Sequence, residues 1–68
     1  MTENIPVILL IEDNPDHVLL IHEALTTNNI LNEVRVTKDG EEALDYLFRR
    51  GKYADPEKSP RPTLIILD

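Results

Sequence analysis

Cysteine and tryptophan are both absent from this 68-residue chain. Without cysteine, the chain can form neither disulfides nor a cysteine-ligated zinc site, which are two common ways of stabilising very small domains. A chain of this length forms at most one small domain, and we expect it to be only marginally stable by itself. The absence of cysteine also favours a reducing compartment, so the predicted location is the cytoplasm.

Long apolar runs and clusters of basic residues are missing as well. The longest apolar run, Val7–Ile11, is far shorter than the roughly 20 residues that a membrane-spanning helix needs. The opening M-T-E-N-I-P has no features of a signal peptide. The formal net charge is −6, and the seven lysines and arginines are spread from position 35 to position 61. This distribution argues against binding to a nucleic-acid backbone, so neither membrane nor nucleic acid is a predicted partner.

Strand and helix signals alternate along the first part of the chain. The run Val7–Ile11 is apolar without alternation, which is typical of a parallel strand buried on both faces. Asn14 is placed to cap a helix that begins at Pro15. One face of that helix is expected to be apolar: Val18, Ile21 and Leu25.

The second part of the chain repeats this alternation. Asp39 and Glu42 have the spacing of a capping box at the start of a helix, and Gly51 is a stop signal for its end. The predicted apolar stripe of this helix contains Ala43, Leu44, Leu47 and Phe48. The predicted elements are a strand at 7–11, a helix at 15–26, a strand at 33–38, a helix between Asp39 and Gly51, a proline-containing surface loop at 52–62 and a strand at 63–67.

This β-α-β-α-β order predicts an α/β fold with a parallel sheet. If the third strand lies on the far side of the first, the strand order is 2-1-3. Right-handed crossovers then put the two helices on opposite faces of the sheet. The first strand is then central. The carboxyl ends of the first and third strands lie side by side, where open α/β sheets bind their ligands.

Acidic residues follow both of these strands. Glu12 and Asp13 come directly after the first, and Asp68 comes directly after the third. Three carboxylates at one rim raise one another's pKa unless a cation compensates them, and hard oxygen ligands suit Mg²⁺. A carboxylate beside Mg²⁺ can attack phosphorus to give an acyl phosphate. The alternative is that these acids only cap a helix or solvate a loop.

The two histidines give no metal-binding pattern of their own. His17 and His22 are five positions apart, which is about 140° around a helix, so they cannot share a ligand face. We expect both to face solvent or to be satisfied by neighbouring groups.

Three motifs carry a resemblance to a known family. I-L-L-I-E-D-N-P, V-x-x-D-G-E-E-A-L-D-Y-L and P-T-L-I-I-L-D are together similar to the first half of a response-regulator receiver domain (CheY-like). The loop R-R-G-K-Y-A-D-P-E-K-S-P-R-P-T is similar to that of the stand-alone receivers that partner phytochrome histidine kinases. The resemblance implies a flavodoxin-like, doubly wound parallel sheet of five strands in the order 2-1-3-4-5. Residues 1–68 would be its N-terminal part, truncated at the phosphoacceptor.

The resemblance also implies roles for single residues. Asp68 would be the phosphoacceptor, Asp13 a direct Mg²⁺ ligand, and Glu12 a second acid acting on the metal directly or through water. The partner would be a sensor histidine kinase, with a homodimer expected for the full-length protein. The chain would be a signalling domain and not an enzyme. Two alternatives stay open: a receiver-like binding module that is not phosphorylated, and a phosphatase or phosphotransferase with an aspartyl nucleophile.

Overall fold

A three-stranded parallel sheet organises the chain. The computed structural model describes residues 6–30 and 32–67, and its strands are β1 (Val7–Ile11), β2 (Glu33–Thr37) and β3 (Leu64–Leu67). Both β2 and β3 pair in parallel with β1, which gives the order β2-β1-β3. The predicted order of elements and of strands is confirmed, although β2 and β3 are each one residue shorter than predicted.

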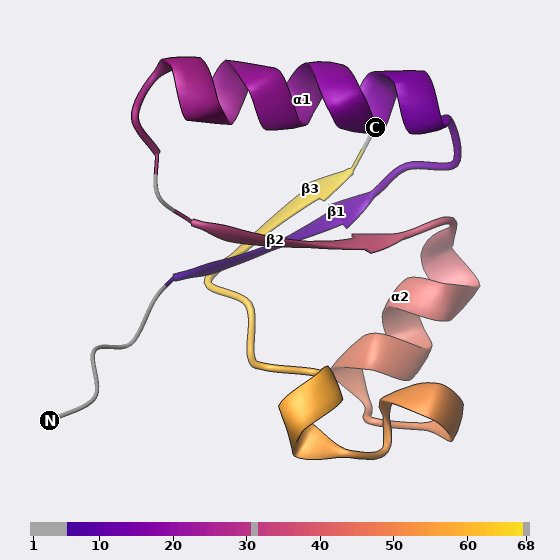
Figure 1. The fold of residues 1–68 in the computed structure, drawn as a ribbon. Coiled ribbons are helices and arrows are strands. Elements are labelled where there is room, and N and C mark those ends of the chain that lie inside the picture. Colours follow the sequence, from indigo (N-terminus) through magenta and orange to yellow (C-terminus); the bar gives the residue numbers. More distant parts are fainter. Residues whose placement is uncertain (1–5, 31, 68) are drawn as a thin grey trace, which may run out of the picture.

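The two helices cover opposite faces of the sheet. Figure 1 shows α1 (Pro15–Thr27) on one face and α2 (Gly40–Leu47) on the other. This arrangement follows from right-handed crossovers, because the chain passes from β1 to one neighbour and then crosses back over β1 to the other. The predicted doubly wound, flavodoxin-like class of α/β fold is confirmed for this portion.

The central strand β1 forms the core of the sheet. Its first four side chains are at most 5% exposed, and Leu9 is fully buried. Leu9 packs against Ala43 and Tyr46 of α2, and its neighbours Ile8 and Leu10 point to the α1 face because side chains alternate along a strand. Burial on both faces explains why β1 is uniformly apolar.

Local hydrogen bonds define both ends of α1. The Asn14 side chain accepts a hydrogen bond of 2.9 Å from the N–H of Asp16, and Pro15 occupies the first turn. The helix ends at Thr27, one residue later than predicted. Its three half-buried side chains are the predicted ones: Val18, Ile21 and Leu25. No helix within the described ranges is long and apolar enough to cross a membrane.

The two predicted capping residues, Asp39 and Glu42, both act at the start of α2. The Asp39 carboxylate accepts a hydrogen bond of 2.8 Å from the N–H of Glu42. The Glu42 carboxylate in turn accepts one of 3.0 Å from the N–H of Lys38. The first bond satisfies a backbone donor that the helix start would otherwise leave without a partner, and the second attaches the residue before the cap to the first turn.

The predicted end of α2 at Gly51 is wrong. The helix ends at Leu47, and Arg49 adopts the left-handed conformation with φ of 53°. That conformation costs a non-glycine residue roughly 1–2 kcal/mol. The Arg49 guanidinium donates to both the hydroxyl and the carbonyl of Ser59, each at 3.2 Å, and hydrogen bonds from a charged group are strong enough to offset this cost. Gly51, with φ of 56°, begins the next turn instead.

The predicted apolar stripe of α2 is half correct. Ala43 is buried and Leu47 is half-buried, but Leu44 and Phe48 are 48% and 66% exposed. Tyr46, which the stripe omits, is only 1% exposed. Its ring packs on the sheet and its hydroxyl donates to a carbonyl of the following loop, so the buried face of α2 is rotated relative to the prediction.

The segment between α2 and β3 is an ordered surface loop, as predicted. It contains two short 3₁₀ turns, η1 (Gly51–Tyr53) and η2 (Pro56–Lys58). Tyr46 donates a hydrogen bond of 2.5 Å to the carbonyl of Pro60. The Arg61 guanidinium donates to the carbonyl oxygens of Leu47, Tyr46 and Ser59. These bonds attach the loop to the end of α2.

Glu42 also makes part of the stability pH-dependent. Partial burial of its carboxyl raises the pKa, but hydrogen bonds from Lys52 and from the N–H of Lys38, together with both lysine charges, outweigh burial and hold the pKa below its ordinary value of 4.5. The Lys52 ammonium lies 3.1 Å from this carboxylate. A carboxyl whose pKa is depressed by folding stabilises the protein above its unfolded pKa, and this stabilisation is lost as the pH falls through the folded pKa.

We therefore expect Glu42→Gln to lower the free energy of unfolding by less than about 1 kcal/mol near neutral pH. The difference from the wild type should shrink to nothing in acid, because the wild-type carboxyl is then protonated. Urea denaturation of the complete protein between about pH 7 and pH 3 measures both values. Glu41→Gln, at an exposed neighbouring position, is the control and should follow the wild type. A Glu42→Gln difference that persists in acid would contradict this account.

Candidate functional site

The three strands end level with one another at one rim of the sheet. In the parallel register, Ile11 of β1 pairs with Thr37 of β2 and with Leu67 of β3. The N–H of Glu12 donates a hydrogen bond of 2.9 Å to the carbonyl of Thr37, which extends the β1–β2 pairing by one residue. The ends of β1 and β3 therefore lie side by side at this rim.

Glu12 is a buried acid at this rim. The residue is only 6% exposed, and its Oε1 accepts a hydrogen bond of 3.0 Å from the N–H of Asn14. The Nδ1 of His17 lies 3.5 Å from the same oxygen. A buried carboxylate is costly unless polar groups surround it, and both of these groups come from the first turn of α1 and the residue that caps it. The structure places Glu12 where the sequence predicts it.

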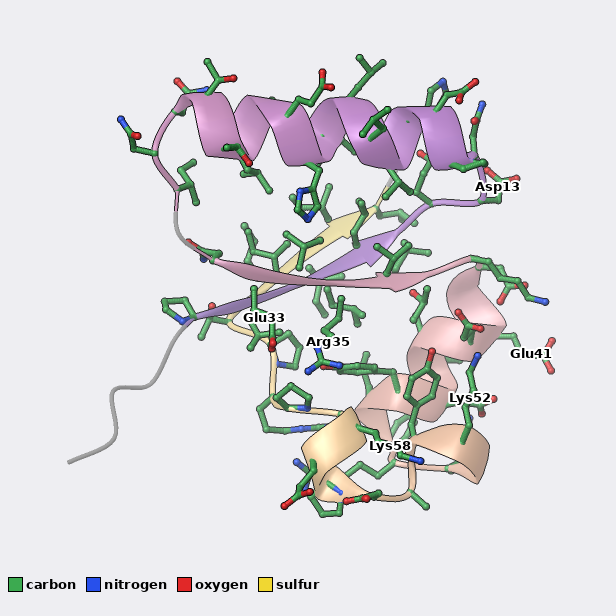
Figure 2. All side chains as sticks on the ribbon, in the orientation of Figure 1. Asp13, Glu33, Arg35, Glu41, Lys52 and Lys58 are labelled. Carbon is green, nitrogen blue, oxygen red and sulfur yellow. The ribbon has the colours of Figure 1, made fainter. Side chains whose placement is uncertain are left out.

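Asp13 lies at the same rim but is exposed to solvent. Figure 2 shows it where the chain leaves β1 and turns into α1. The two acids thus differ in environment: Glu12 is held from the helix side, and Asp13 is open to water. An exposed carboxylate beside a fixed one suits a hydrated, oxygen-seeking cation such as Mg²⁺, which usually keeps several of its water ligands.

Asp68, the predicted phosphoacceptor and third acid, lies outside the described residues. Its chain neighbour Leu67 is the last residue of β3 and pairs with Ile11, which directly precedes Glu12. Within the described ranges, no group of three or more His, Cys, Asp or Glu side chains could hold a metal ion. The donor set that the described part does supply, Glu12 and Asp13, consists only of carboxylate oxygens and fits Mg²⁺ in its chemistry.

The sequence interpretation missed one residue of this site. His17 approaches Glu12, although no histidine was expected to take part in the site. The histidine spacing gave no signal for it. The relevant signal is that His17 falls three residues after the capping Asn14. It therefore lies in the first turn of α1, next to the end of β1.

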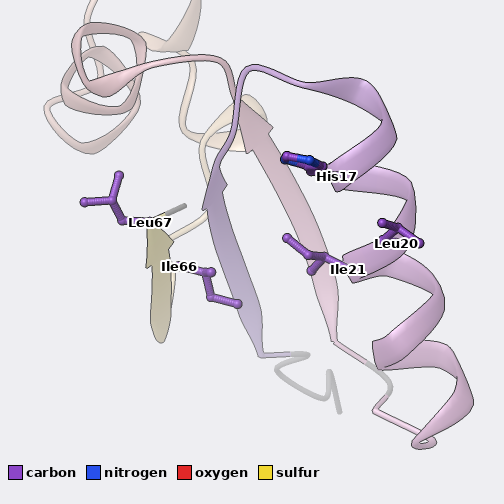
Figure 3. A pocket seen from close by; sticks show the side chains of 5 residues that line it. All are labelled: His17, Leu20, Ile21, Ile66 and Leu67. Carbon is purple, nitrogen blue, oxygen red and sulfur yellow. The ribbon is translucent and has the colours of Figure 1, made fainter.

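A shallow apolar cavity of about 330 Å³, open to solvent, lies between α1 and β3. Five residues line it: His17, Leu20, Ile21, Ile66 and Leu67. In Figure 3, Ile21 of α1 and Ile66 of β3 point toward each other across it. His17 therefore has two environments. Its Nδ1 approaches Glu12 at the rim that carries Glu12 and Asp13, here called the acid rim, and its ring lines this cavity.

Comparison with known proteins shows the family to which the chain belongs. No protein-family model matches it. It is 44% identical over 62 residues to the response regulator Rcp1 of Synechocystis sp., a match that covers 91% of this chain and 40% of Rcp1. The crystal structure of RPA3017, a response regulator in red light signaling of R. palustris, matches with a TM-score of 0.90 and 33% identity, over 94% of this chain and 45% of that one. The chain is part of a response-regulator receiver domain.

A second solved structure relates this receiver domain to phytochrome response regulators. The phosphorylated cyanobacterial phytochrome response regulator RcpA matches with a TM-score of 0.75 and 40% identity, over 91% of this chain and 42% of RcpA. The receiver portion described here spans less than half the length of each of these relatives. The family resemblance in the sequence motifs is thereby confirmed.

Proposed function

We propose that Asp68 is the phosphoacceptor of this receiver domain, and that Glu12, Asp13 and Asp68 together hold Mg²⁺. The observation that supports the proposal most strongly is the register of β1 with β3. Ile11 is level with Leu67, and each of these residues is followed directly by an acid in the sequence. A solved relative, RcpA, is described in its phosphorylated form.

The proposed reaction is the transfer of a phosphoryl group from a kinase phosphohistidine to Asp68. A carboxylate oxygen of Asp68 attacks phosphorus, the P–N bond to the histidine breaks, and the electron pair of that bond returns to the imidazole, which takes up a proton. When bound, Mg²⁺ would screen the repulsion between the carboxylate and the phosphoryl oxygens. Glu12 and Asp13 would contribute by holding the cation, with Glu12 fixed in one orientation by Asn14 and His17.

The proposed partner is a sensor histidine kinase of the phytochrome type. RcpA is described as a phytochrome response regulator and RPA3017 as a regulator in red light signaling, which supports this choice of partner. Phosphorylation of the complete protein, in the cytoplasm and as a homodimer, would pass the signal on by a conformational change. In this proposal the domain is a phosphoprotein in a signalling relay and has no separate enzymatic activity.

Asp13→Asn tests the proposed Mg²⁺ site. Because the amide has no negative charge, we expect the variant of the complete protein to bind Mg²⁺ at least about tenfold more weakly, as even indirect supporting groups commonly have effects of that size. Isothermal titration with MgCl₂ measures the dissociation constant. Asp16→Asn is a matched control, since Asp16 is an exposed acid in the first turn of α1 and is not a proposed ligand. Equal affinities in the wild type and Asp13→Asn would remove Asp13 from the site.

One observation favours a second candidate, a receiver-like binding module that is not phosphorylated. Glu12 is held by Asn14 and His17, which is also how an acid with a purely structural role would be held. The two functions differ in one measurement. The binding module would show neither Mg²⁺ binding nor Mg²⁺-dependent labelling by acetyl phosphate, and the phosphoacceptor would show both.

A further inference from the structure

His17 links the first turn of α1 to the buried acid at the rim. Its Nδ1 lies 3.5 Å from Oε1 of Glu12, and the side chains are 53% and 4% exposed, respectively. The same oxygen accepts the N–H of Asn14 at 3.0 Å. Two nitrogen atoms from one short segment therefore approach one carboxylate oxygen from the helix side.

We propose that His17 is a positioning residue for the Glu12 carboxylate, and thereby for Mg²⁺ binding at the rim. This inference rests on the proposed function, because it assigns His17 a role toward the metal that Glu12 would hold. A carboxylate has two oxygens with several acceptor positions. Groups that hold one oxygen therefore restrict the orientation of the other. Such supporting groups commonly change metal affinity by an order of magnitude or more.

The contact involves a particular atom of the imidazole. Nδ1 is two bonds from Cβ, and the side-chain nitrogen of asparagine is also two bonds from Cβ, so His17→Asn keeps a donor at the same distance along the side chain. His17→Leu instead keeps apolar bulk next to the cavity between α1 and β3 and removes the donor. These two variants separate the polar contact of His17 from its packing.

Mg²⁺ titration of the complete protein tests the proposal. We expect His17→Leu to raise the Mg²⁺ dissociation constant about tenfold, and His17→Asn to bind nearly as tightly as the wild type. His22→Leu replaces an exposed histidine on the same helix and should have no effect. The thermal midpoint of each metal-free variant, recorded in parallel, reports any change in folding.

Each outcome decides between specific explanations. Unchanged affinity in His17→Leu would overturn the role of His17 and leave the proposed phosphoacceptor function intact. Equal weakening in His17→Leu and His17→Asn would assign the effect to the ring and also overturn the inference. A wild-type protein that binds no Mg²⁺ would reject the proposed function itself, and the inference with it.

Discussion

Asp68→Asn should abolish phosphorylation of the complete protein by acetyl phosphate and by a cognate histidine kinase. The amide of asparagine is a far poorer nucleophile toward phosphorus than a carboxylate, and it contributes no charge to a cation at the rim. Labelling should fall to background at every Mg²⁺ concentration, whereas the wild type should be labelled in a Mg²⁺-dependent manner. Phosphate-affinity gel electrophoresis with a time course measures this directly.

Asp45→Asn is the matched control for this experiment. Asp45 lies in α2 and pairs with Arg50 at 3.2 Å, so its carboxylate is engaged on the opposite face of the sheet from α1. We expect its labelling to match that of the wild type. Labelling that survives in Asp68→Asn would show that another residue accepts the phosphoryl group, and labelling lost in both variants would indicate a general effect on folding.

Leu9→Ala should cause a large loss of stability. Leu9 is fully buried in the central strand and packs against Ala43 and Tyr46. Removing a buried leucine side chain and leaving a cavity costs about 2–5 kcal/mol, a large part of the roughly 5–15 kcal/mol that keeps a typical domain folded. Urea denaturation of the complete protein should show a markedly lower midpoint.

Leu19→Ala removes the same number of atoms from an exposed position. Leu19 is 59% exposed on α1, so we expect its loss to change stability by less than about 0.5 kcal/mol. Similar losses in the two variants would mean that Leu9 is not at the centre of the core. The pair therefore tests the assignment of β1 as the central strand, on which the position of the acid rim depends.

The features that were predictable from the sequence are those set by local patterns. The uniformly apolar run Val7–Ile11 indicated a central strand, and Asn14 with Pro15 and Asp39 with Glu42 indicated helix starts, because capping depends on residues only two or three positions apart. Right-handed crossovers then placed the two helices on opposite faces, once the third strand was put on the far side of the first. These signals sufficed to place Glu12 and Asp13 at the rim.

The features that were not predictable depend on contacts between distant residues. Arg49 replaces the expected glycine at the end of α2 because Ser59, ten positions away, accepts its hydrogen bonds. Tyr46 belongs to the core because its hydroxyl reaches the carbonyl of Pro60. The approach of His17 to Glu12 depends on how the first turn of α1 lies over the end of β1. The role of Asp68 stays a prediction, since that residue lies outside the described ranges.

The loop between α2 and β3 is attached to the end of α2 and leads into the start of β3, where the N–H of Thr63 donates to the carbonyl of Val7 at 2.8 Å. It therefore meets the sheet at the opposite end of the strands from Glu12 and Asp13. The exposed turn at Pro56–Lys58 is consequently a suitable attachment point for a fluorophore or an epitope tag. A reporter placed there could follow signalling in living cells while leaving the acid rim chemically unchanged.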